Sequence, residues 1–196
     1  MESARLSRRL LPDIVRLRAS VEGYRTAFSF IHDTGEIESI DARSLYLRAC
    51  AIAAHLHRSH LTGRRGLLLY APGLEFICAF VGAMLAGVVA VPVMPPTVHR
   101  RLKSFQAIAL DAEADVVLTT GSVKHALSRH LHEWRALHEL PWLATDRLPL
   151  DDAAQWPEPS IDGDDLAYKR AGTRRARLGR PPHAPTALRR GANAYR

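Results

Sequence analysis

The stretch RGLLLYAPGLEFICAFVGAMLAGVVAVPVMPP, residues Arg65–Pro96, decides the fold. It opens with Leu67–Tyr70, an apolar run of the length typical of a buried strand. Pro72 and Gly73 follow, and neither residue suits the interior of a strand. The strand is therefore expected to end before Pro72, and a new element to begin at Leu74.

From Leu74 the pattern becomes helical. Apolar residues recur on one side of the expected helix: Leu74, Ile77, Cys78, Val81 and Leu85. The other side carries mostly small residues, which let a helix lie close to a neighbouring sheet: Glu75, Ala79, Gly82, Ala83 and Ala86. Gly87 is expected to stop the helix, Val88–Val91 to form a second buried strand, and Pro92 to end its hydrogen-bonding ladder. Strand, helix and strand in this space predict a βαβ unit with parallel strands.

A membrane span is the alternative for the same stretch. Phe76–Val98 contains no charged residue and is long enough to cross a bilayer. However, Gly87 and Pro92 divide the run, and no close cluster of Lys or Arg flanks it to set an orientation. The pattern favours the βαβ unit.

The segments before this unit predict a helix, a hairpin and a second helix. Leu10, Ile14, Leu17 and Val21 form the apolar face of a short amphipathic helix over Leu10–Val21. Arg25–Ile31 and Glu36–Ile40 predict two strands of a hairpin around a turn at residues 32–35. Asp41 is a good N-cap for a helix that runs to about Ser59. Its apolar face comprises Leu45, Ala49, Ile52, Ala53 and Leu56.

The segments after the unit continue the alternation of helix and strand. The expected elements are a helix over Arg101–Ala114, a strand over Asp115–Thr120, a helix over Ser122–Leu137 and a short strand over Trp142–Ala144. Prolines and acids over Thr145–Asp164 predict a surface connection, and Asp165–Tyr168 predicts the start of another strand. The fold class is therefore α/β, with an incomplete parallel sheet flanked by helices.

Charge divides the chain into two parts. The 196 residues are 47% hydrophobic and carry a formal net charge of +7. Lys169–Arg196 holds nine Lys or Arg and no acid, so residues 1–168 hold 18 basic and 20 acidic residues, a net of −2. This tail has no apolar periodicity and is expected to be disordered. We predict a domain over 1–168 and a basic tail over 169–196.

The cysteines and the N-terminus predict a cytoplasmic protein. Cys50 and Cys78 are isolated and give no disulfide framework, which suits a reducing compartment. Arg5, Arg8 and Arg9 are followed by a short apolar pair that Pro12 interrupts, so no continuous apolar segment of a secretory signal is present.

LLLYAPGLEF followed by AGVVAVPVMPP resembles the early core of the adenylate-forming ligases. The doubled proline Pro95–Pro96 resembles the fatty acyl-AMP ligase branch, which is related to the long-chain acyl-CoA synthetases. The resemblance extends from about Tyr24 to Tyr168 and covers about the first third of a full-length member. It implies the N-terminal subdomain of an enzyme that activates a fatty acid with ATP and Mg²⁺. The acyl group would then pass to an acyl-carrier protein or to CoA.

The family's catalytic motifs have no counterpart here. The Gly/Ser/Thr-rich phosphate loop of the family follows soon after a segment such as IDGDDLAY, but Lys169 onward contains no such loop. No residue matches a catalytic, cofactor-binding or metal-binding motif of the family, so no site residue is assigned. The resemblance therefore predicts a truncated member that is inactive alone. Its sheet is expected to leave an apolar face uncovered and to self-associate.

The tail has two interpretations. Gly172–Gly179 (GTRRARLG), read with its codons shifted by two bases, can encode Tyr-Thr-Ser-Gly-Ser-Thr-Arg, which resembles the missing phosphate loop. The favoured hypothesis is that the tail is a frameshifted translation of a former ATP site. The alternative, from a different functional class, is a binding module whose basic arm attracts nucleic acid or anionic membrane.

Two other features are assigned ordinary structural roles. The histidines near helix ends lack the Cys or carboxylate neighbours of a metal site, and are expected on polar faces: His55, His57, His60, His125, His130, His132 and His138. Glu75 stands alone on its helix and is expected to face solvent or lie near the strand ends, not to act as a general base.

Overall fold

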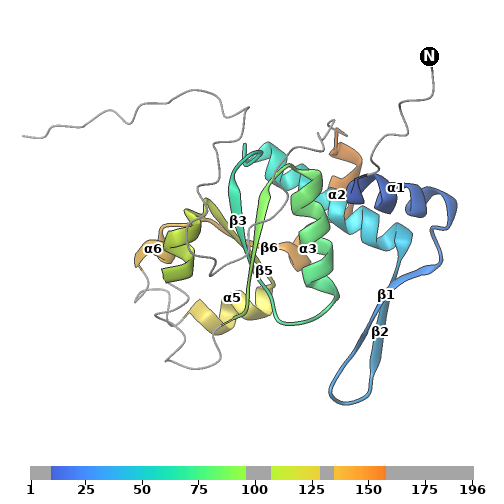
Figure 1. Ribbon diagram of the computed structural model, residues 1–196, viewed down its shortest axis with the longest axis horizontal. Helices are drawn as coiled ribbons and strands as arrows, with labels where there is room; N and C mark the ends of the chain where they lie inside the picture. The colour runs from blue at the N-terminus through green and yellow to red at the C-terminus, as the bar shows by residue number, and fades with distance from the viewer. Residues whose placement is uncertain (1–9, 96–106, 129–134, 158–196) are drawn as a thin grey trace, which may run out of the picture.

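The computed structural model describes residues 10–95, 107–128 and 135–157. These residues form a four-stranded parallel sheet with helices on both faces, and a separate two-stranded hairpin (Figure 1). The strand order in the larger sheet is β4-β3-β5-β6. Its strands are β3 (Arg65–Leu69), β4 (Val89–Val93), β5 (Val116–Thr119) and β6 (Trp142–Ala144). The predicted α/β fold with a parallel sheet is confirmed.

The predicted βαβ unit is present as β3, α3 (Leu74–Leu85) and β4. Gly87 ends the unit's helical part with a φ of 64°, a left-handed conformation that glycine adopts without a steric cost. The prediction that Pro92 ends the ladder is wrong, because Pro92 lies inside β4 and pairs with Leu68. β4 is an edge strand of the described sheet, and an edge strand tolerates a residue without an N–H group on its open side.

One face of the sheet is covered by α3 and by α2 (Ala42–Arg58). The small residues of α3 were expected against the sheet, but Gly82 faces α2 instead. A Cβ atom at Gly82 would lie 2.8 Å from Ile52 Cβ and 2.9 Å from the Ala49 carbonyl oxygen. Glycine therefore sets how closely the two helices approach.

The other face of the sheet is covered by the helical residues 107–112, by α5 (Gly121–Ser128) and by α6 (Arg135–His138). They contribute four buried side chains to a second core, namely Ala109, Ala112, Leu127 and Leu137. The expectation that truncation leaves an apolar face of β3, β4 and β5 open is wrong, because the chain's own helices bury both faces. Self-association is not tested by this arrangement and stays a prediction.

The two cores share the strand β3. Leu68 faces the α2 and α3 side, whereas Leu67 and Leu69 face the helical residues of the second core, and all three leucines are 0% exposed. Successive residues of a strand point to opposite faces, so a strand buried on both sides is apolar throughout. For this reason, apolar and polar residues do not alternate in the sequence of β3.

The hairpin and the first helix form the N-terminal region. β1 (Thr26–Ile31) and β2 (Ile37–Asp41) pair antiparallel, as predicted, and project from the sheet (Figure 1). Asp41 caps α2, as predicted, and its Oδ1 accepts the N–H of Ser44 at 2.7 Å. The helix α1 (Leu11–Val21) is also confirmed.

The predicted face of α1 is reversed. Pro12 and Val15 are its buried residues, whereas Ile14, Leu17 and Val21, expected to face inward, are exposed. A helix whose apolar stripe faces water is unusual.

The segment after β6 is more than a surface connection. It forms the 3₁₀ turns η2 (Thr145–Arg147) and η3 (Leu150–Gln155), and Thr145 and Trp156 are buried. η3 packs against α2, where Arg58 donates to Asp152 at 2.7 Å. The prediction of a purely surface segment is therefore wrong for the described part.

Several expectations fall on residues that the structure does not describe: the strand at 165–168, the basic tail at 169–196, and parts of the helices expected over 101–114 and 122–137. Cys50 and Cys78 are free and buried. Among the described residues, no helix combines the length and the apolar character that crossing a bilayer requires.

Candidate functional site

The topology indicates where a ligand site would lie. The chain passes from β3 through α3 to β4 on one side, and β5 then adds on the other side of β3. The helices that follow β3 and β5 cover opposite faces, because α3 belongs to one core and α5 to the other. In open α/β sheets, ligands bind in the crevice at the carboxyl ends of such neighbouring strands. Tyr70 follows β3 there, and Thr119 ends β5.

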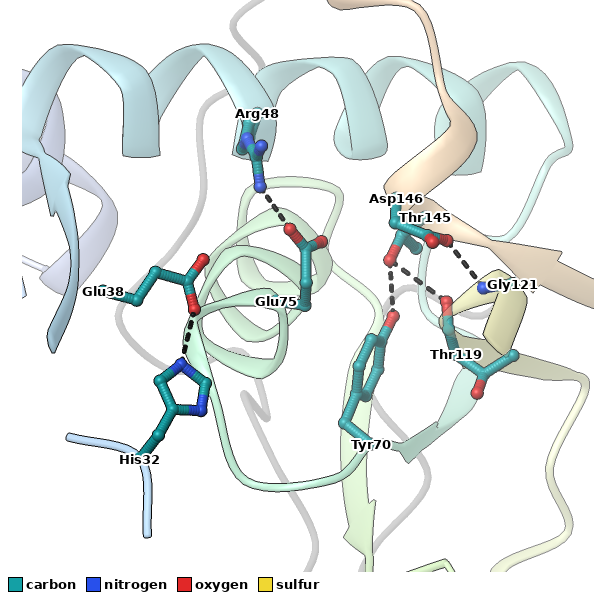
Figure 2. Close-up of polar contacts among 9 residues, drawn as sticks. All are labelled: His32, Glu38, Arg48, Tyr70, Glu75, Thr119, Gly121, Thr145 and Asp146. Carbon is teal, nitrogen blue, oxygen red and sulfur yellow. Dashed lines mark hydrogen bonds and ion pairs between the residues drawn. The ribbon is translucent and has the colours of Figure 1, made fainter. Parts of the chain in front are cut away.

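Side chains of the chain itself fill this crevice. The hydroxyl groups of Tyr70 and Thr145 lie 2.7 Å apart, and Thr145 also donates to the Thr119 carbonyl oxygen at 3.3 Å (Figure 2). The Thr119 hydroxyl in turn donates to the Leu69 carbonyl oxygen at 2.7 Å. Burial raises the pKa of Tyr70 far above its ordinary value, so the phenol stays neutral and does not act as a base. The network closes the crevice.

The N-terminus of α5 is also occupied by a group of the chain. The residues Thr120, Gly121 and Ser122 have the small and hydroxylated character that a phosphate loop needs. Yet the N–H of Gly121 donates to Asp146 Oδ1 at 2.8 Å (Figure 2). The Arg147 guanidinium packs directly against Gly121. A carboxylate thus takes the place that a phosphate would need.

The N-terminus of α3 carries an acid. Glu75 lies in its first turn, close to the carboxyl end of β3 as expected, and pairs with Arg48 of α2 (Figure 2). A carboxylate is favourable at this positive end of a helix and repels a phosphate. Burial acts to lower the pKa of Arg48, but the Glu75 carboxylate outweighs it and holds that pKa above its ordinary value. The pair is a structural link between two helices.

Beside this pair lies a pocket of about 210 Å³ between α2, α3 and η2. Arg48, Glu75, Cys78, Thr145 and Asp146 contribute its polar lining. Burial raises the pKa of Cys78 to about 11, so its thiol is protonated at neutral pH and is a poor nucleophile. The described lining offers no activated nucleophile with an adjacent base.

The histidines lie at separate places. His57 packs its ring edge-on against Trp156, and burial lowers the pKa of His55. His32, on the hairpin, pairs with Glu38 at 3.5 Å (Figure 2). His130 and His132 lie outside the described residues. Within the described part, no group of three or more His, Cys, Asp or Glu side chains is placed to hold a metal ion.

Sequence reasoning missed Thr145, Asp146 and Arg48. Thr145 and Asp146 follow the last short strand directly, and this position alone was a usable signal, because parallel strands bring their carboxyl ends to one edge. Arg48 gave no signal, since its partner Glu75 is 27 residues away in the sequence.

The family model described as "AMP-binding enzyme" matches residues 16–169. That region includes most of α1, the hairpin and every strand of the parallel sheet. The chain therefore belongs to the AMP-binding enzyme family, the family of the adenylate-forming ligases.

Its curated relatives are fatty acid ligases. The medium-chain-fatty-acid–[acyl-carrier-protein] ligase JamA of Moorena producens is 36% identical over 163 residues, which are 81% of this chain and 28% of JamA. The long-chain-fatty-acid–AMP ligase FadD23 of Mycobacterium tuberculosis is 30% identical over 72% of this chain and 25% of its own length.

A solved structure shows the same fold, and this chain again matches only part of its length. The fatty acyl-adenylate ligase of Legionella pneumophila, solved with acyl adenylate and pyrophosphate, superimposes with a TM-score of 0.71 at 31% identity. The match covers 83% of this chain and 28% of that one. The chain thus spans less than a third of the length of these three relatives.

Proposed function

We propose that this chain supplies the N-terminal part of a fatty acid-activating ligase, whose reaction is the ATP-dependent conversion of a fatty acid to an acyl-adenylate. The observation that carries the proposal is the family match over residues 16–169 together with fatty acid ligases as relatives. The solved relative that binds acyl adenylate and pyrophosphate supports the same reaction class.

The described residues do not fit ATP or its Mg²⁺ ion. A phosphate group would meet the Glu75 carboxylate at the start of α3 and the Asp146 carboxylate at the start of α5. Tyr70 and Thr145 close the crevice between them. We infer that these residues form a supporting scaffold, and that residues 1–196 do not form acyl-adenylate by themselves.

The test is fatty-acid-dependent exchange of pyrophosphate into ATP, with Mg²⁺, by the purified chain. We expect exchange no higher than that of a heat-inactivated control. Clear exchange above this control would show that the chain holds a complete adenylation site and would overturn the scaffold role.

The acceptor of the acyl group in the whole enzyme is proposed from the relatives: an acyl-carrier protein, as the name of JamA states, or CoA, as the names of related ligases state. A cytoplasmic location is proposed from the two free cysteines and the lack of a spanning helix among the described residues.

A second function is favoured by the composition of the tail alone. Nine basic residues and no acid in Lys169–Arg196 suit nonspecific attraction to nucleic acid or anionic lipid. Binding should be measured at near-physiological salt, with unrelated nucleic acids and anionic vesicles, for the full chain and for a chain cut after Tyr168. Tight and selective binding that the cut abolishes would favour a functional arm over a frameshifted remnant.

A further inference from the structure

The helix α1 carries apolar residues on two opposite sides. Pro12 and Val15 pack inward. A second apolar set at spacings of three and four residues runs along the outer side, because residues so spaced share one face of a helix. This set, the α1 stripe, is Leu11, Ile14, Leu17 and Val21, which are 45%, 41%, 42% and 73% exposed.

The hairpin has a similar uncovered pair. Ile31 and Ile37 lie directly opposite each other in the register of β1 and β2, and are 67% and 64% exposed. A two-stranded sheet is marginally stable alone and normally gains a third strand or a covering helix. The hairpin projects away from the parallel sheet, so its tip lies apart from that sheet (Figure 1).

The α1 stripe and the Ile31–Ile37 pair are exposed, whereas helices of this chain cover both faces of the parallel sheet. The family match begins at residue 16, so most of α1 and the whole hairpin lie within the matched region. The relatives JamA and the Legionella pneumophila ligase each hold about 72% of their length beyond the part matched here, since the match covers 28% of each. That additional polypeptide is a candidate occupant of an uncovered surface.

We propose that the α1 stripe and the Ile31–Ile37 pair form the surface on which the remaining polypeptide of a fatty acid-activating ligase docks. The inference rests on the proposed function. A helix that binds in a groove of its partner does so through apolar side chains spaced as those of the α1 stripe are. Cross-strand pairs of β-branched side chains, such as Ile31 and Ile37, pack against neighbouring apolar groups.

The charges of α1 disfavour a membrane as the occupant. A helix that lies in a membrane surface carries a polar face rich in Lys and Arg. α1 instead holds two basic residues, Arg16 and Arg18, and Asp13 offsets one of them, because its side chain lies 3.8 Å from that of Arg16. A groove of the same ligase needs no excess of positive charge.

The experiment uses the full 196-residue chain and, as the probe, JamA of Moorena producens with its matched region deleted. The two polypeptides are produced together, and complex formation and affinity are measured by size-exclusion chromatography and titration. The test variants are Leu17→Glu on the stripe and Ile37→Glu on the hairpin. The control is Ser20→Glu, which adds the same charge at an exposed position of α1 off the stripe.

We expect a stable complex with the unaltered chain. Each test variant should weaken it by about tenfold or more, because a charge would be buried in an apolar contact. Ser20→Glu should change the affinity by less than about twofold. Because all three positions are exposed, the variants should keep the far-ultraviolet circular dichroism and melting temperature of the unaltered chain, and this is checked first.

Four results would overturn the docking surface: no complex with the probe; equal affinity for all variants; stripe-dependent binding to vesicles of anionic phospholipid in place of the probe; or stripe-dependent self-association that the probe does not compete with. Pyrophosphate exchange by the complex is measured separately. A complex that depends on the stripe but shows no pyrophosphate exchange would count against the proposed reaction and uphold the docking surface. Exchange by the complex that Leu17→Glu and Ile37→Glu leave unchanged would support the proposed reaction and count against the docking surface.

Discussion

The parallel sheet and the N-terminal hairpin bury their strands to very different extents. In the sheet, Leu68 is 0% exposed, and helices cover both faces. In the hairpin, Ile31 is 67% exposed although it has the same apolar character. The difference is that helices of this chain cover both faces of the described sheet, whereas apolar side chains of the N-terminal region are exposed.

The largest expected effect is in the sheet. Leu68→Ala removes a side chain that packs between β3 and the α2 and α3 helices, and it leaves a cavity in a close-packed core. We expect a loss of about 2–5 kcal/mol in the free energy of unfolding. Chemical denaturation followed by circular dichroism measures it.

The matched change in the hairpin is Ile31→Ala. Because this side chain is mostly exposed in the isolated chain, we expect a change within about 0.5 kcal/mol. Equal losses of unfolding free energy for Leu68→Ala and Ile31→Ala would mean that the hairpin is already covered in solution. The proposed difference in burial between the sheet and the hairpin would then be wrong.

A smaller effect is expected in the crevice at the strand ends. Tyr70→Phe removes a buried hydroxyl that lies 2.7 Å from Thr145 Oγ1, and Thr145 keeps its bond to the Thr119 carbonyl oxygen. We expect a loss of about 0.5–1.5 kcal/mol in the free energy of unfolding. Hydrogen exchange should show faster opening of β5 and η2 with no change in β1 and β2. A change confined to the hairpin would contradict this assignment.

A further expected loss of stability depends on pH. Burial raises the pKa of Cys78 from 9.0 to about 11, so the folded chain holds the thiol proton more tightly than the unfolded chain does. The stabilisation is complete below pH 9 and is lost as the pH rises from about 9 to about 11, by about 1 kcal/mol at pH 10.

Denaturation at pH 8 and pH 10 measures this loss, in a Tyr70→Phe background that removes the buried phenol. Cys78→Ala should reduce the difference between the two pH values. An unchanged difference would mean that Cys78 is solvated in the native chain.

Local patterns predicted most elements. The run Leu67–Tyr70, the break at Pro72 and Gly73, and the helical spacing from Leu74 all depend on near neighbours, and the structure confirms the βαβ unit that they predict. The boundaries moved by one or two residues, because β3 also pairs along its start with β4 and β5.

Predictions that needed distant partners were less successful. Gly82 was expected against the sheet but faces Ala49 and Ile52 of α2, and no local pattern distinguishes a sheet from a helix as the neighbour of a small residue. The closure of the crevice depends on Thr145, which lies 75 residues after Tyr70.

By itself, the sequence determined the alternation of strands and helices, the parallel sheet and the family resemblance, because apolar periodicity and turn residues act over a few positions. The tertiary structure alone decided which side of α1 packs inward and which groups fill the crevice at the strand ends. Both sides of α1 carry apolar residues, so periodicity could not choose between Val15 and Leu17. The choice follows from the surface that α2 offers, which exists only once the chain has folded.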